Sequence, residues 1–213
     1  MRWRLVAWIA FGTLVTAIAY TSRFTEGKPD RDALYKWTTA IGELVLFAII
    51  IGVTLAIAGS QRQLLALRRP FSWKRAAAVA VPVFILVFLA ITAMDQALHG
   101  SDEQGLVPKH WESGHAGAFA ANFVVVALVA PFAEELLFRG LGVSLLYPRL
   151  GKWATIIAIG VAFGLYHGLV EALPELALFG SALAWLRLRT GSVFPGMLAH
   201  AAFNAVGLLS VFF

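Results

Sequence analysis

The stretch of sequence that decides the fold is VVVALVAPFAEELLFRGLGVSLLY, residues 124–147. It is apolar over most of its length, yet it holds three charged side chains, Glu134, Glu135 and Arg139. A charged side chain in hydrocarbon costs at least about 2.5 to 3.5 kcal/mol. Charges inside an apolar run long enough to cross a bilayer therefore indicate a functional site.

The whole chain has the composition of a membrane protein. Of its 213 residues, 60% are apolar and 14% are charged, whereas soluble domains average about half apolar and a quarter charged. The chain has no cysteine, which excludes disulfides and thiolate metal sites. Its net charge of +5 lies in short loops and forms no basic stripe with aromatic residues, so nucleic acid is not an expected partner. The expected surroundings are a lipid bilayer.

Outward from this stretch, seven apolar segments are bounded by charges, Gly or Pro. They are residues 3–22, 40–59, 76–98, 116–147, 153–170, 173–188 and 193–213. The sequence predicts an all-α, polytopic transmembrane helix bundle that forms one domain over residues 1–213. The fourth segment exceeds one span, and Pro131 near its middle predicts a kink between an interfacial piece and a bent span. The short sixth segment leaves open an eighth segment or a re-entrant turn around Pro174.

Successive segments would cross the membrane in opposite directions, so their ends fall into two sets, one on each side. The basic residues are divided unevenly between these two sets. Eleven lie at one set: Arg2, Arg4, Arg62, Arg68, Arg69, Lys74, Arg75, Arg149, Lys152, Arg187 and Arg189. Five lie at the other: Arg23, Lys28, Arg31, Lys36 and Lys109. Because cytoplasmic loops are enriched in Lys and Arg, we predict a cytoplasmic N-terminus and an outside C-terminus. The first segment has no small-residue cleavage site after it, so we expect a retained span.

Helical spacing separates the two glutamates of the fourth segment. Glu135 and Arg139 are four residues apart, so on a helix they share a face and form an ion pair in the favourable order. Glu134 is turned about 100° away, which leaves its carboxylate free. The sequence therefore predicts Glu134 as a general base, with Glu135 and Arg139 supporting it.

Two later segments place polar side chains at a similar depth. AFGLYHG puts His167 deep in the fifth segment, and AHAAFNAV puts His200 and Asn204 on one face of the seventh. At 1.5 Å per residue, Glu134, His167 and Asn204 lie about 16 to 21 Å from the cytoplasmic ends, and His200 lies about 10 Å from its end. Polar side chains from three segments in neighbouring layers predict a shared site.

Small residues repeat at helical spacing around this predicted site. Gly160, Gly164 and Gly168 recur every four residues, and Gly196 precedes His200 by four. Faces made of glycine let helix backbones approach closely. We expect these faces to pack the helices that carry the site.

The other polar groups have ordinary interpretations. Glu43 and Asp95 lie near the outward ends of their segments, where we expect them to reach the interface or to pair with loops. The loop segment HWESGH holds His110, Glu112 and His115, but its spacing matches no strong metal-site pattern. We expect a solvated loop there.

A carboxylate, two imidazoles and a carboxamide suit hydrolysis by an activated water. We predict that Glu134 is the base, that His167 holds the water, and that His200 and Asn204 donate to the oxyanion. The segments hold no serine or lysine nucleophile with a partnered base. Zinc is the alternative because Glu and His are zinc ligands, but HExxH is absent and asparagine is a poor zinc ligand, so no cofactor is expected.

Three short motifs carry a resemblance to a known family. EELLFR at 134–139, FGLYH at 163–167 and HAAFN at 200–204 resemble, in order and spacing, the signature motifs of the CAAX-protease and bacteriocin-processing family of intramembrane endopeptidases. That family, also called CPBP or Abi, includes the type II CAAX prenyl endopeptidase. The resemblance covers residues 116–213 as a catalytic core, whereas residues 1–115 carry only hydropathy and contain spans of uncertain role.

The resemblance implies a glutamate-dependent protease of the bacterial cytoplasmic membrane that cuts a membrane-associated peptide or protein. It implies the same roles for the motif residues: catalytic for Glu134, His167, His200 and Asn204, supporting for Glu135 and Arg139. A prenylated substrate is not implied, because many bacterial relatives act on other membrane peptides.

Two alternatives stay open. A polytopic transporter or proton relay also places Glu, Arg and His inside the membrane. Transporters typically have internal repeats and paired broken helices, and the sequence has neither clearly. A non-catalytic bacteriocin-immunity protein on the same fold is the second alternative, and the complete set of motif residues argues against it.

Overall fold

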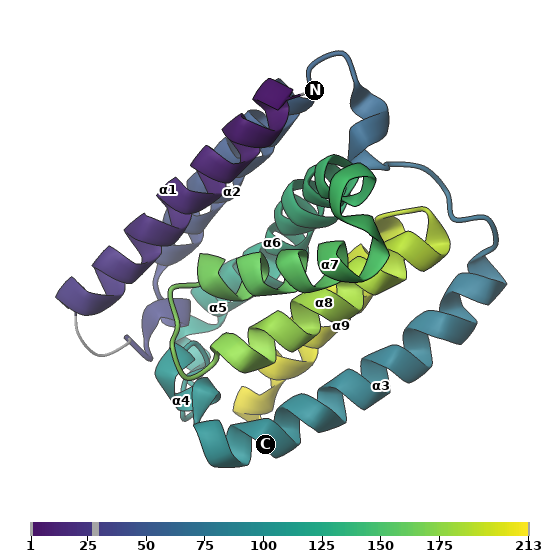
Figure 1. The fold of residues 1–213 in the computed structure, drawn as a ribbon. Helices are drawn as coiled ribbons and strands as arrows, with labels where there is room; N and C mark the ends of the chain where they lie inside the picture. Colours follow the sequence, from purple (N-terminus) through teal and green to yellow (C-terminus); the bar gives the residue numbers. More distant parts are fainter. Residues whose placement is uncertain (1, 27–29, 213) are drawn as a thin grey trace.

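A computed structural model describes residues 2–26 and 30–212 and is helical along nearly all of that length, with no strand in the described part (Figure 1). The long helices are α1 (Arg2–Glu26), α2 (Trp37–Ala58), α3 (Trp73–Leu98), α7 (Val143–Tyr166), α8 (Leu173–Thr190) and α9 (Phe194–Leu209). The short α-helices are α4 (Gly100–Gln104), α5 (Ala116–Val124) and α6 (Ala130–Glu134). Two π-helical segments are η4 (Val125–Val129) and η5 (Glu135–Gly142). Short 3₁₀ turns are η1 (Ala33–Tyr35), η2 (Arg62–Leu65), η3 (Ser113–His115) and η6 (Ser210–Phe212). The predicted all-α fold is confirmed.

Five stretches of described helix are long and apolar enough to cross a membrane, which makes the chain an integral membrane protein. They are Arg2–Thr25, Trp37–Ala58, Trp73–Leu98, Ser113–Tyr166 and Phe194–Phe212. Ser113–Tyr166 contains the fourth and fifth predicted segments, and α8 is outside the set because its 18 residues hold Glu175, Arg187 and Arg189. The count of seven spans stays a prediction.

The central helix runs from α5 through η4, α6 and η5 into α7. The sequence predicts a kink at Pro131, but the structure has a different irregularity there. The π-helical segment η4 lies before the proline, and the π-helical segment η5 lies after it. Proline removes one backbone N–H and crowds the preceding turn, and a π-bulge is a common way to absorb such a local mismatch. The helix ends at Gly151, whose φ of 71° is outside the helical region, and the chain then turns back (Figure 1).

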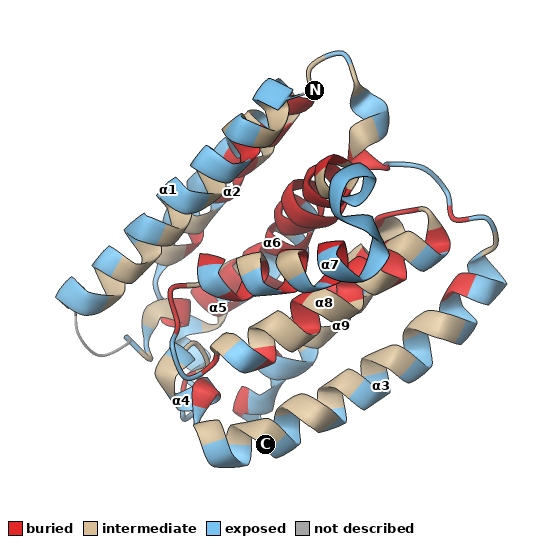
Figure 2. Cartoon of the chain, in the orientation of Figure 1, coloured by how far each residue is buried: buried red, intermediate tan, exposed pale blue. Residues whose placement is uncertain are grey.

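The most deeply buried part of the molecule is η5, of which all eight residues are buried (Figure 2). Trp8 of α1 packs edge-on against Phe138 and donates its indole N–H to the carbonyl of Leu137 at 3.0 Å. The charged motif therefore lies at the centre of the bundle, where neighbouring helices determine its geometry.

The predicted glycine face of α7 packs closely against α8. A Cβ added to Gly160 would lie 2.0 Å from Ser181 Oγ, and one added to Gly164 would lie 3.0 Å from the carbonyl oxygen of Leu173. Only glycine permits this separation of the two helices. The close approach holds α7, which ends at Tyr166 directly before His167, against the core.

The helix α3 lies at one side of the bundle, with Ala76 as its only buried residue within the described part (Figures 1 and 2). Its aromatic rings Phe84 and Phe88 pack edge-on against Phe203 of α9, with ring centroids 6.3 and 6.0 Å away. This aromatic contact connects the outlying helix with the helix that carries His200 and Asn204.

Candidate active site

The three motif segments meet at a cavity of about 560 Å³. Its deep wall is formed by Glu134, His167, His200 and Asn204, together with the ring of Phe163. These residues come from α6, the end of α7 and α9. The structure thus brings together the four predicted catalytic side chains on one cavity.

His200 lies between the two neighbouring glutamates. Its Nε2 is 3.7 Å from Glu134 Oε2, and its Nδ1 is 3.4 Å from Glu135 Oε1. All three side chains are buried. The two carboxylates point to different nitrogens of one imidazole because they follow each other around the helix.

Gly196 makes this arrangement possible. It lies one turn before His200 on α9, and a Cβ added there would lie 2.6 Å from Glu135 Oε2. A real Cβ atom is essentially never found that close to an oxygen. The glycine therefore lets α9 approach the glutamates, which extends the predicted packing role of Gly196 to the site itself.

The predicted ion pair between Glu135 and Arg139 is present. Arg139 Nη1 lies 2.9 Å from Glu135 Oε1, and both side chains are fully buried. The guanidinium also donates from Nη2 to the carbonyl of Gly180 at 3.2 Å and lies over the ring of Phe163, 4.2 Å from its centroid. A buried charge of this kind is stable only while it stays paired, so Arg139 and Glu135 form one unit.

His167 is the C-cap of α7, and its ring is oriented by the backbone of that helix. Its Nδ1 lies 2.8 Å from the carbonyl oxygen of Phe163. A carbonyl oxygen only accepts hydrogen bonds, so Nδ1 carries the proton and the neutral ring offers Nε2 as an acceptor. An acceptor on the cavity wall is suited to bind a water.

Asn204 lies one turn beyond His200 on α9. Its Nδ2 donates to the carbonyl oxygen of Val126 at 2.9 Å, inside the π-helical segment η4. This bond fixes the orientation of the carboxamide. The amide has a second N–H, and the side chain lines the cavity.

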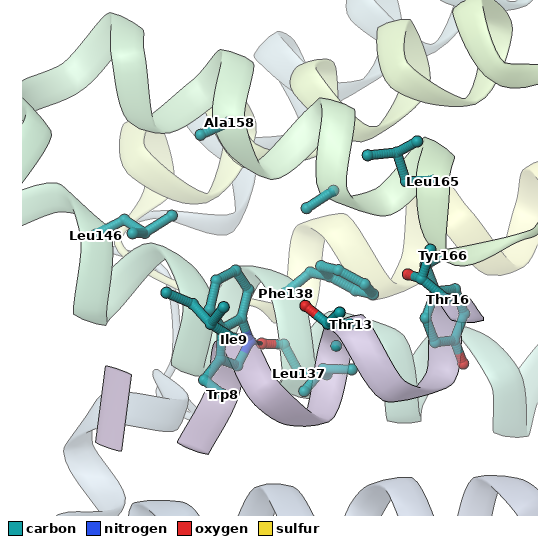
Figure 3. A pocket seen from close by; sticks show the side chains of 12 residues that line it. Trp8, Ile9, Thr13, Thr16, Leu137, Phe138, Leu146, Ala158, Leu165 and Tyr166 are labelled. Atoms are coloured by element: carbon teal, nitrogen blue, oxygen red, sulfur yellow. Dashed lines mark hydrogen bonds between the residues drawn. The ribbon is translucent and has the colours of Figure 1, made fainter. Parts of the chain in front are cut away.

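A second, apolar cavity of about 390 Å³ lies behind the site, between α1, η5 and α7 (Figure 3). Trp8, Thr13, Leu137 and Tyr166 are among its lining residues. The ring of Tyr166 also lies edge-on to His167, 5.3 Å between centroids. Phe138 lines this cavity and packs edge-on against Phe163, which lines the larger one, so aromatic rings lie between the two.

Glu43 was not expected at the site. It lies on α2 and lines the large cavity, and its Oε2 is enclosed without a hydrogen-bond partner among the described residues. The expectation that Glu43 reaches the interface was wrong, because this face of α2 turns towards the cavity. The expectation for Asp95 was right: its carboxylate accepts bonds from the backbone N–H and hydroxyl of Ser101 at 2.8 and 2.7 Å.

Glu103 of α4 holds the loop that follows His167. Its carboxylate accepts backbone N–H bonds from Val170, Glu171 and Ala172 at 2.9, 2.7 and 3.1 Å, and lies 3.6 Å from Arg23 Nη2. No signal in the sequence indicates this role, since the partners are 67 to 69 residues away.

The HWESGH segment forms one local pair and one hydrogen bond to a distant part of the chain. His115 Nδ1 lies 2.9 Å from Glu112 Oε2, and the hydroxyl of Tyr35 donates to the carbonyl of His110 at 2.7 Å. Within residues 2–26 and 30–212, no three His, Asp or Glu side chains gather as they do around a metal ion. The expected solvated loop agrees with the exposure of these side chains.

The comparisons with known proteins point to one class. Residues 116–206 match the family model described as Rce1-like, type II CAAX prenyl endopeptidase Rce1-like. This segment contains all three motifs, and the match confirms the resemblance predicted from them. A search of the curated proteins and of the solved structures found no match.

Proposed function

We propose that the protein is an intramembrane endopeptidase that hydrolyses a peptide bond of a membrane-associated peptide or protein with a glutamate-activated water. The observation that carries the proposal is the convergence of Glu134, His167, His200 and Asn204 on one cavity, inside the segment that matches the Rce1-like family. A bacterial cytoplasmic membrane and seven spans belong to this proposal. Prenylation of the substrate does not.

The proposed reaction begins with the water. His167 Nε2 accepts one hydrogen bond from it, and the carboxylate of Glu134 takes its other proton as the oxygen attacks the substrate carbonyl. The carbonyl electrons move onto oxygen, where His200 Nε2 and the second N–H of Asn204 donate to the developing negative charge. Glu134 then returns its proton to the amine nitrogen as the peptide bond breaks.

Arg139 and Asn204 support this sequence of steps. Arg139 neutralises Glu135, which leaves Glu134 as the carboxylate that faces the cavity with His200 beside it. Oxyanion donors act best when they are held in place before the reaction. Asn204 meets this condition through its bond to Val126.

The test is cleavage of candidate membrane peptides by the purified protein, with and without chelator. Glu134→Gln keeps the shape of the side chain but removes the base, so we expect a loss of about 10²- to 10⁴-fold. Unchanged cleavage by Glu134→Gln would contradict the mechanism. A complete loss with chelator that added zinc restores would replace it with a zinc mechanism.

The same preparation distinguishes the other functions. Solute uptake by reconstituted vesicles without proteolysis would favour a transporter. Protection of cells from a bacteriocin that is equal for wild type and Glu134→Gln would favour the non-catalytic immunity protein.

A further inference from the structure

The active-site cavity extends from the buried motif residues to one end of the bundle. At that end its lining includes the exposed polar residues Ser101, Asp102, Gln104 and Ser210, which belong to α4 and to the turn after α9. Arg31 pairs there with Asp102 at 2.9 Å. The mouth of the cavity is therefore at the end of the bundle where α4 lies (Figure 1).

The opposite end of the bundle carries only positive charge. Its residues are the eleven basic side chains Arg2, Arg4, Arg62, Arg68, Arg69, Lys74, Arg75, Arg149, Lys152, Arg187 and Arg189, and its loops hold no Asp or Glu. Bonds between these loops confirm that they gather at one end: Arg68 Nε donates to the carbonyl of Gly191 at 2.8 Å, and Val193 N–H to that of Ala66 at 3.3 Å. The hydroxyl of Ser144 donates to the carbonyl of Leu64 at 2.8 Å.

The end of the bundle that holds the cavity mouth carries more acidic than basic residues. Nine of the 12 acidic residues lie in or next to its loops: Glu26, Asp30, Asp32, Asp95, Asp102, Glu103, Glu112, Glu171 and Glu175. Its basic residues within the described part of the chain are Arg23, Arg31, Lys36 and Lys109. The remaining three acids, Glu43, Glu134 and Glu135, are those of the cavity and the buried motif.

This asymmetry decides which side of the membrane the mouth faces. Loops rich in Lys and Arg stay in the cytoplasm, and the rule counts short loops such as these. The basic end is therefore the cytoplasmic end. The cavity mouth, at the opposite end, is on the far side of the membrane.

We propose that the active-site cavity opens to the extracytoplasmic side, and that its substrates are membrane-associated peptides presented there after export. The substrate class rests on the proposed protease function, whereas the orientation does not. A peptide tail on the cytoplasmic side would have to pass the eleven basic residues and the packed η5 to reach Glu134. A segment anchored in the membrane with its outer end free reaches the mouth directly.

The absence of cysteine makes the orientation measurable. Ser101→Cys places a thiol at the mouth, Ser210→Cys places a second one at the same end, and Ser60→Cys places a matched one in the exposed loop between α2 and η2. Intact cells are treated with a membrane-impermeant maleimide, before and after permeabilisation. We expect Ser101→Cys and Ser210→Cys to react in intact cells and Ser60→Cys to react only after permeabilisation. The unmodified chain is the blank.

The opposite labelling pattern would overturn the proposal. Labelling repeated in the Glu134→Gln background separates the orientation from the activity, since an inactive protein still reports its topology. A reporter peptide anchored with its cleavable segment on either side then tests the substrate class. Cleavage of the outer version supports it, and cleavage of the cytoplasmic version alone overturns it.

Discussion

At the scale of single residues, the site depends on how closely α9 approaches the two glutamates. His200 contacts both carboxylates because Gly196, one turn earlier, has no side chain to hold the helices apart. The geometry of the proposed catalytic site is therefore determined partly by a residue that has no reactive side chain.

Gly196→Ala should displace the carboxylate of Glu135 and lower both stability and peptidase activity. Insertion of a methyl group into a packed core costs about 1–3 kcal/mol, and the added Cβ would lie 2.6 Å from Glu135 Oε2. Thermal unfolding and cleavage rate measure the two effects. Gly207→Ala on the same helix is the control, because nothing lies within 4 Å of its added Cβ. Equal behaviour of the two variants would contradict the packing argument.

Arg139→Leu should destabilise the protein strongly, because it leaves Glu135 as an unpaired buried charge. Removal of one partner of a buried ion pair costs about 3–5 kcal/mol. The control is Arg31→Gln, which breaks the partly exposed pair with Asp102 and should cost about 1 kcal/mol or less. Unfolding in detergent compares them. A smaller loss of unfolding free energy for Arg139→Leu than for Arg31→Gln would show that the buried pair does not stabilise the site.

At the scale of elements, the five-residue helix α4 controls the end of α7. The carboxylate of its Glu103 accepts hydrogen bonds from three successive backbone N–H groups in the loop after His167. Hydrogen bonds to a charged group contribute about 1.5–3 kcal/mol each. The position of His167 is thus coupled to an element at the cavity mouth.

Glu103→Gln should loosen this loop and lower kcat more than it raises KM, because His167 is proposed to hold the attacking water. Hydrogen exchange of residues 167–172 should accelerate in the same variant. Glu171→Gln is the control, since Glu171 is an exposed residue of the same loop. Normal exchange in Glu103→Gln, or an equal change in both variants, would contradict the coupling.

At the scale of the whole molecule, the sequence predicted what depends on local spacing and missed what depends on distant partners. The pair of Glu135 and Arg139 follows from a spacing of four, and the close packing of α7 follows from Gly160 and Gly164. The position of Glu43 at the cavity and the bonds of Glu103 to the loop after His167 depend on helices far away in the chain. Local spacing therefore did not reveal them. The π-helical turns around Pro131 replaced the predicted kink because the surrounding bundle keeps the helix continuous.

Because α3 buries only Ala76 among its residues, we expect the proposed peptidase activity to be sensitive to bilayer thickness. Its 26 residues span about 39 Å at 1.5 Å per residue, more than a hydrocarbon core of about 30 Å, so hydrophobic mismatch is relieved by tilt. Tilt of α3 moves Phe84 and Phe88 against Phe203, the neighbour of Asn204. Lipids of different acyl-chain length would in this way shift the proposed oxyanion donor, and the membrane itself would act as a regulator of the proposed reaction.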